Sequence, residues 1–216
     1  MQSIGKLLTC LIVLFCGAVA VFAAAPNVTY TAAGTFGNPA VSGADELKMA
    51  GEPFTINIVA SSASEPIKHG SNWAVYSPFK MTGEVHSGLV GPTPVNIASG
   101  AASIQLAQGP DYDIFIAAFP VKVVGISLTV KATIQLPVGT LANLYVHPFS
   151  PVTLDPTITS VVYSDGTNDT TLSIQSGSLT AVVGSGTGSV QRTAVPNTSD
   201  AVALAKFHMF DFEPRA

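Results

Sequence analysis

The chain has 216 residues, of which 47% are hydrophobic and only 10% are charged. This hydrophobicity, together with a net charge of only −4, excludes a disordered chain. Nine Lys and Arg against thirteen Asp and Glu exclude a basic nucleic-acid-binding protein. The many Gly, Pro, Ser, Thr and Val residues favour strands and turns over long helices.

Residues 1–23 have the pattern of a secretory signal peptide. Lys6 supplies the positive charge, residues 7–22 form an apolar run without charge, and small residues around Ala23 suit a signal peptidase. The apolar run is shorter than the roughly 20 residues that a membrane-spanning helix needs. We therefore expect cleavage after Ala23 or Ala24, no membrane association afterwards, and a secreted, periplasmic or cell-surface location, with bacterial export favoured.

Both cysteines, Cys10 and Cys16, lie inside this signal segment. The mature chain, residues 24–216, therefore contains no cysteine. This excludes a disulfide framework, a thiol nucleophile and a Cys-ligated metal. No linker or composition shift divides it, so we expect one domain over residues 24–216 that is held together by its core.

The mature chain alternates apolar and polar residues with a period of two. Phe54, Ile56 and Ile58, for example, alternate with Thr55 and Asn57. The same alternation runs through residues 28–36, 79–86, 102–106 and 171–174, and it resumes at residue 179 after Ser176 and Gly177, which we read as a turn. Each segment is typical of a strand with one dry face. The pattern predicts an all-β fold: a single antiparallel β-sandwich, of jelly-roll or Ig-like type, with roughly nine to twelve strands.

Two segments depart from simple alternation. Residues 114–119 are apolar at every position, which predicts a central strand buried from both sides. Within residues 121–136 the apolar positions move from odd to even numbers after Val124 and Gly125. We interpret this change as a β-bulge or bend near Gly125, where the strand passes from one sheet to the other.

Residues 34–56 carry a family resemblance. Gly34-Thr35-Phe36, then Gly43, then the stretch from Gly51 to Ile56 resemble the opening of exported bacterial β-sandwich proteins of the PEP-CTERM type. The resemblance implies an exported β-sandwich. The Pro-Glu-Pro motif, apolar tail and terminal basic cluster of that sorting anchor do not occur here, so free secretion is expected, and the resemblance carries over no catalytic residue.

Catalytic motifs are missing from the sequence. No Gly-x-Ser-x-Gly elbow, His-Glu-x-x-His helix or Gly-x-x-x-x-Gly-Lys phosphate loop occurs. The best acidic pair is Asp111 and Asp113, since two carboxylates are what glycoside hydrolysis needs. The other interpretation of this pair is a solvated turn and strand entry, which we prefer.

Two further clusters are candidate binding sites. Trp73 and Tyr76 lie among polar residues and form a ligand platform or, alternatively, close the end of the core. Asp165, Asn168 and Asp169 offer the oxygen ligands of calcium in a tight loop, but the same residues are typical of a hairpin turn without an ion.

The sequence favours an exported, non-catalytic protein with a structural or ligand-binding role. Its expected partner is a glycan, or else another surface protein, and no nucleic acid. The alternatives are a hydrolase that uses acidic residues on carbohydrate and a calcium-dependent binding module. No cofactor is expected, calcium being the one alternative. The aromatic residues 207–212 are expected to dock as a final strand.

Overall fold

The computed structural model describes residues 25–123, 125–141 and 143–187, and these residues form strands, turns and loops without a helix. The expectation of an all-β, antiparallel fold is therefore confirmed. The signal segment at residues 1–23 and the final strand expected at residues 207–212 lie outside the described residues.

Twelve strands follow one another along the described chain, and all their pairings are antiparallel. They are β1 (Pro26–Phe36), β2 (Pro53–Ser61), β3 (Lys68–His69), β4 (Trp73–Tyr76), β5 (Lys80–Ser87), β6 (Gly91–Ala98), β7 (Ser103–Gln108), β8 (Tyr112–Val123), β9 (Ile126–Pro137), β10 (Phe149–Thr153), β11 (Ser160–Ser164) and β12 (Asp169–Thr187).

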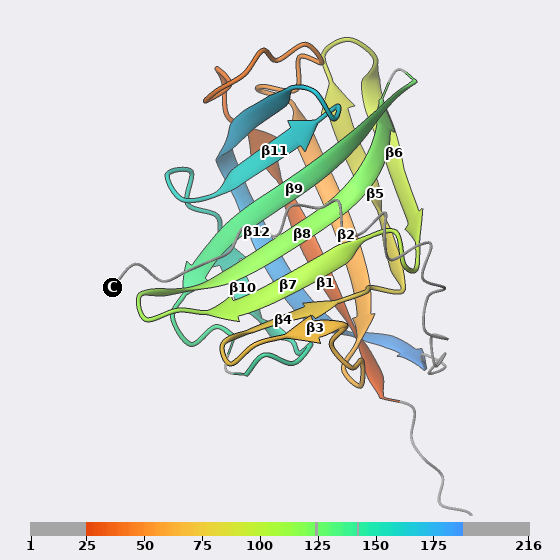
Figure 1. Ribbon diagram of the computed structural model, residues 1–216, viewed down its shortest axis with the longest axis vertical. Helices are drawn as coiled ribbons and strands as arrows, with labels where there is room; N and C mark the ends of the chain where they lie inside the picture. Colours follow the sequence, from red (N-terminus) through yellow and green to blue (C-terminus); the bar gives the residue numbers. More distant parts are fainter. Residues whose placement is uncertain (1–24, 124, 142, 188–216) are drawn as a thin grey trace, which may run out of the picture.

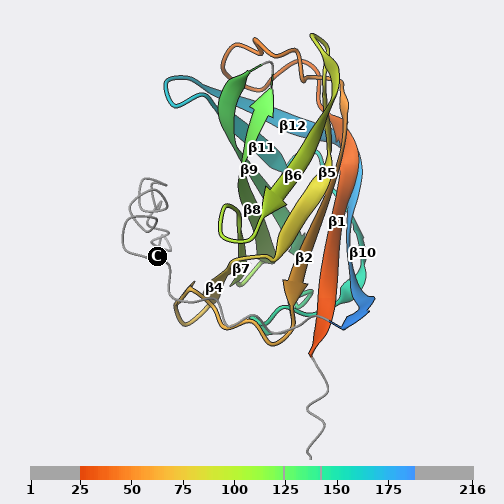
Figure 2. The same ribbon diagram turned by 90° about the vertical axis from the view of Figure 1, so that its right-hand side faces the viewer.

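The strands form one continuous, curled sheet rather than two separate ones. Its hydrogen-bonded order is β3-β4-β7-β8-β9-β11-β12-β1-β2-β5-β6, and β10 pairs with β12 off this path. The sheet curls so that β1, β2, β5 and β6 form one wall and β4, β7, β8, β9 and β11 form the other (Figures 1 and 2). The architecture is thus a half-barrel with two facing walls, which corrects the expected sandwich of two distinct sheets.

The strand that connects the two walls is β12. Its first residues pair with β11 and the rest pair with β1, with a register shift between Thr35 and Phe36. At this corner Gly34 lies opposite Gly177, and a Cβ on Gly34 would lie 2.3 Å from the carbonyl oxygen of Ser176. The two backbones approach too closely for a side chain, so glycine is needed for the bend. The turn expected at Ser176 and Gly177 is therefore wrong, because β12 continues through both residues.

The connection between β8 and β9 is a hairpin and not a bulge. Tyr112 pairs with Pro137 and Val123 pairs with Ile126, so the two strands are in register along their whole length. Gly125 supplies the positive φ of the turn, at 82°. Odd-numbered residues of β8 pair with even-numbered residues of β9. The inward, apolar positions therefore change from odd to even numbers at the hairpin without any bulge. The bulge predicted near Gly125 is therefore wrong.

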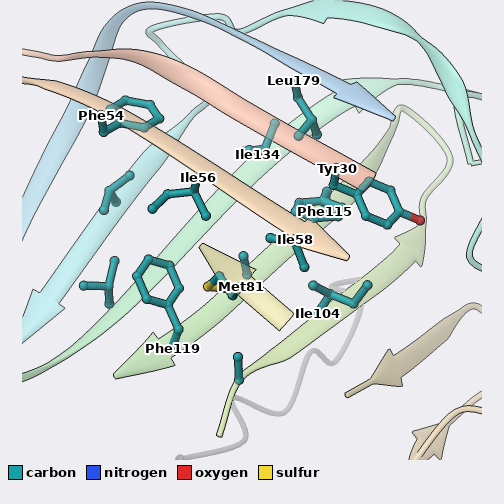
Figure 3. Packing of buried hydrophobic residues seen from close by; sticks show 14 of the residues in the cluster. Tyr30, Phe54, Ile56, Ile58, Met81, Ile104, Phe115, Phe119, Ile134 and Leu179 are labelled. Carbon is teal, nitrogen blue, oxygen red and sulfur yellow. The ribbon is translucent and has the colours of Figure 1, made fainter. Parts of the chain in front are cut away.

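The inward side chains of both walls form one hydrophobic core (Figure 3). Phe36 stacks on Phe54 with ring centroids 4.7 Å apart. Tyr30 from one wall contacts Phe115 from the other at 5.1 Å. The residues expected on dry strand faces are largely buried, including Val28, Tyr30, Phe36, Phe54, Ile56, Ile58, Ile104, Leu106, Leu172 and Ile174.

Residues 114–119 are central in the sheet but are buried from one side only. Phe115 and Phe119 are fully buried in the core, whereas Ile114 and Ile116 on the other face are half-buried. The prediction of burial from both sides is wrong in this respect, because among the described residues no second layer crosses that face (Figure 1). The outward apolar residues of β8 therefore contribute to a surface.

Candidate functional site

The outer face of the wall formed by β4, β7, β8 and β9 carries a regular array of side chains. Cross-strand partners share a face of a sheet, so the pairing register places them in rows. One row runs from Trp73 through Ala107 and Ile114 to Gln135. The adjacent row runs from Val75 through Gln105 and Ile116 to Thr133. We call this set the outer platform: Trp73, Val75, Gln105, Ala107, Ile114, Ile116, Thr133 and Gln135.

The outer platform is uncharged and chemically mixed. Its eight side chains are all half-buried and comprise one indole, two amides, one hydroxyl and four aliphatic groups. An indole offers a flat apolar ring with a polar edge, and each amide both donates and accepts hydrogen bonds. The arrangement can therefore stack on the apolar face of a ring and hydrogen-bond to hydroxyl groups at its rim.

Trp73 is held in position by the hairpin of β3 and β4. The Gly70 N–H donates a hydrogen bond to the Trp73 carbonyl at 2.8 Å. A Cβ on Gly70 would lie 2.4 Å from the indole Nε1, so the ring lies directly against the glycine backbone. The loop is also tied to β7, since the Gln108 N–H donates to the Asn72 carbonyl at 2.8 Å and the Asn72 amide donates to the Gln108 carbonyl at 3.2 Å. The indole is thereby pre-oriented on the outer face.

Tyr76 lies on the opposite face of β4 and does not join Trp73. Its side chain is 1% exposed, and its hydroxyl donates a hydrogen bond to the Leu144 carbonyl at 2.5 Å. Burial raises the pKa of this phenol above its usual value. Tyr76 therefore closes the end of the core, as the second interpretation of the sequence had it, and only Trp73 is placed to touch a surface ligand.

Asp165 and Asn168 form the hairpin turn between β11 and β12. Asp165 Oδ1 accepts hydrogen bonds from the N–H groups of Thr167 and Asn168, both at 2.7 Å, and these bonds lower the pKa of the carboxyl. Asp169 begins β12 opposite Ser164. Asp165 and Asn168 line a small hollow with Glu46, but no three His, Cys, Asp or Glu side chains of the described residues are spaced to hold a metal. Calcium binding by Asp165, Asn168 and Asp169 stays a prediction.

The two carboxylates expected as an alternative catalytic pair have different surroundings. Asp113 is 1% exposed, and its Oδ2 accepts a hydrogen bond from the buried N–H of Leu141 at 2.7 Å. Asp111 is exposed in the turn before β8. A glycosidase needs both carboxyl groups at the scissile bond. Since Asp113 anchors the loop that follows β9, its position favours a structural role. The expectation of a solvated residue is right for Asp111 and wrong for Asp113.

Sequence reasoning found Trp73 but missed Gln105, Ile114, Ile116 and Gln135. The two-sided apolarity of residues 114–119 was the signal for Ile114 and Ile116, although it was interpreted as a second buried face. The two glutamines carry no such signal, because only the pairing register of β7, β8 and β9 brings them beside the indole.

In comparisons with known proteins, no family model, no curated protein and no solved structure matches this chain. Within the described ranges, no helix has the length and apolar character required to span a membrane.

Proposed function

We propose that this chain is an exported, non-catalytic protein that binds an uncharged glycan on the outer platform. The proposal includes the signal peptide at residues 1–23, the likeness to PEP-CTERM-type exported proteins, and a location outside the cytoplasm. The observation that carries it is the fixed indole of Trp73, which lies in one row with the amide of Gln135 on a sheet face that no other described strand covers.

The chemistry of the platform favours an uncharged polysaccharide over an anionic one. None of its eight side chains carries a charge, and the nearest cations on the same face, Lys68 opposite Val75 and Lys131 opposite Ala118, lie beside the platform rather than within it. Recognition within the platform therefore rests on ring stacking and neutral hydrogen bonds. Sugar rings combine an apolar face with equatorial hydroxyls, which match an indole and flanking amides. A chain of linked sugars would extend along the row from Trp73 to Gln135.

The test is a binding screen of the purified protein against soluble neutral polysaccharides by affinity electrophoresis and calorimetry. Trp73→Ala should weaken binding by about 30-fold, which corresponds to roughly 2 kcal/mol for a central aromatic contact. Gln135→Ala should weaken it less, because one hydrogen bond is lost and the stacking surface remains.

The matched control is Tyr145→Ala. Tyr145 is an aromatic residue that is 63% exposed in the loop after β9 and is not part of the outer platform. Its replacement should leave glycan binding unchanged. Binding that is lost equally in both variants, or retained in Trp73→Ala, would contradict the platform.

A further inference from the structure

The loop between β9 and β10 is hydrogen-bonded to the wall that carries the outer platform. We call its described residues, 138–141 and 143–148, the β9–β10 loop. Leu141 fixes this loop in the core, because its side chain is 0% exposed. The Leu141 N–H donates a hydrogen bond to Asp113 Oδ2 at 2.7 Å, and the Leu141 carbonyl accepts one from the side-chain amide of Gln108. Asp113 and Gln108 are cross-strand partners in the β7–β8 hairpin, so the loop and this hairpin hold each other.

The same loop is connected to β4, the strand that presents Trp73, at both ends of that strand. Directly before β4, the carbonyl and the side-chain amide of Asn72 are bonded to the backbone of Gln108, whose own side chain reaches the loop. At the last residue of β4, the Tyr76 hydroxyl donates to the Leu144 carbonyl at 2.5 Å. Trp73 therefore lies between two connections to one loop.

Strand β4 needs such connections because its own sheet contacts are few. It has four residues, and its neighbour towards the edge of the sheet, β3, has two. The pairing with β3 includes Ala74 and Val75, and Trp73 lies one residue beyond it. Segments with few contacts and exposed backbone hydrogen bonds are the first to open locally. An indole on such a strand is easily displaced unless other groups hold the strand.

Gln108 and Tyr76 lie on the inner face of the wall and cannot touch a ligand on the outer platform. Alternate residues of a strand share a face, and Gln108 is in phase with Leu106, which is 0% exposed. Tyr76 is 1% exposed and lies on the opposite face of β4 from Trp73. Any effect of either side chain on ligand binding therefore passes through the backbone of β4 and of Asn72.

We propose that the β9–β10 loop is the support that orients the indole of Trp73, with Gln108 and Tyr76 as positioning residues of the binding site. The inference rests on the proposed function, because it concerns the same platform, and it adds that side chains on the inner face set the affinity of the outer face. A side chain that is already ordered in the free protein costs less to immobilise on binding. Without the two connections this ordering would accompany ligand binding and weaken it about fivefold.

The test follows the indole directly, since Trp73 is the single tryptophan of the chain. The double variant with Gln108→Met and Tyr76→Phe removes both hydrogen-bonding groups and nearly preserves the side-chain volumes. In the ligand-free full chain, time-resolved fluorescence anisotropy should show a loss of residual anisotropy, because the indole gains fast local motion. The dissociation constant of a neutral polysaccharide that binds the native protein should rise about fivefold.

Thr170→Val is the matched control for Tyr76→Phe. The buried Thr170 hydroxyl donates to the Ala44 carbonyl at 2.7 Å, at the start of β12 and away from β4 (Figures 1 and 2). Each of these variants removes one hydroxyl that is bonded to a loop carbonyl, so both should lower the unfolding midpoint by a similar amount. Tyr76→Phe alone should increase the local motion of the indole.

Two results would overturn the inference: an indole as rigid in the double variant as in the native protein, or an equal gain of motion in Thr170→Val. If the double variant does not fold, Gln108→Met and Tyr76→Phe are measured singly, with the same two outcomes. An unchanged dissociation constant in a variant whose indole has become mobile would overturn the link to binding. A native protein that binds no neutral polysaccharide refutes the proposed function instead, and the anisotropy of the ligand-free chain then still decides whether the loop orients Trp73.

Discussion

Replacing Asp113 by alanine should lower the thermal unfolding midpoint of the protein markedly. The carboxylate is buried and accepts a hydrogen bond from the N–H of Leu141, which is itself 0% exposed. The side-chain amide of Gln108 donates to the carbonyl of the same Leu141. Asp113 and Gln108, paired across β7 and β8, thus bind both backbone polar groups of one buried residue, Leu141.

The expected cost follows from what alanine leaves behind. A buried N–H without a partner costs about 1–3 kcal/mol, and the lost packing of the side chain adds to it, so we expect a loss of roughly 2–3 kcal/mol. For a protein of this size each kcal/mol lowers the midpoint by about 2–4 °C. The unfolding midpoint of Asp113→Ala should therefore lie roughly 4–12 °C below that of the native protein. The midpoint of Asp113→Asn should fall less, because asparagine keeps an acceptor oxygen.

The assay is urea and thermal unfolding followed by circular dichroism, with Asp111→Ala as the matched control. Asp111 is two residues away but exposed in a turn, so its replacement should stay within about 0.5 kcal/mol of the native protein. If Asp113→Ala is as stable as Asp111→Ala, the carboxylate does not anchor the loop. A functional role for the pair would then have to be reconsidered.

Three other predictions concern the close packing at Gly34, the loss of stability at alkaline pH, and calcium binding in the turn after β11. Gly34→Ala places a Cβ against the backbone of β12 and should cost about 1–3 kcal/mol by overpacking, measured by urea unfolding; native-like stability would refute the close approach. Burial raises the pKa of the Tyr163 phenol to about 12. As the pH rises, the unfolded chain therefore loses this proton before the folded chain does. The contribution of Tyr163 to the free energy of unfolding is thus full below about pH 10 and declines towards pH 12. The stability difference between the native protein and Tyr163→Phe should therefore narrow between pH 10 and pH 12, and a constant difference would argue against it. Asp165 already accepts two N–H groups of its own turn, so millimolar calcium should leave the unfolding midpoint unchanged, and a rise that disappears in Asp165→Asn would instead establish a calcium site.

The strands and their inward faces could be predicted because alternation is a local property of the sequence. The curl could not be predicted in this way. Gly177 looks like a turn residue when only its neighbours in sequence are considered, yet it serves the close approach of β1, which is distant in sequence. The change of parity at Gly125 is equally compatible with a bulge and a hairpin, and only the pairing of β8 with β9 decides between them.

The candidate site was predictable to the extent that its residues share a strand. Trp73 and Tyr76 are three positions apart, an odd separation that places them on opposite faces of one strand. This signal was present in the sequence and excludes a joint platform. The neighbours of Trp73 come from β7, β8 and β9. Such a grouping depends on the register of the strands, which no local pattern encodes.

The pairing of β1 with β12 determines when the molecule can fold. Tyr30 lies opposite Ala181, so the first described strand finds this partner only after nearly all of the described chain has been made. Contacts this distant in sequence slow folding, because the entropy of closing the long intervening loop is lost before the contact can form. A nascent chain would therefore remain open until its last described strand is available. The strand that joins the two walls is thus also the strand whose arrival closes them.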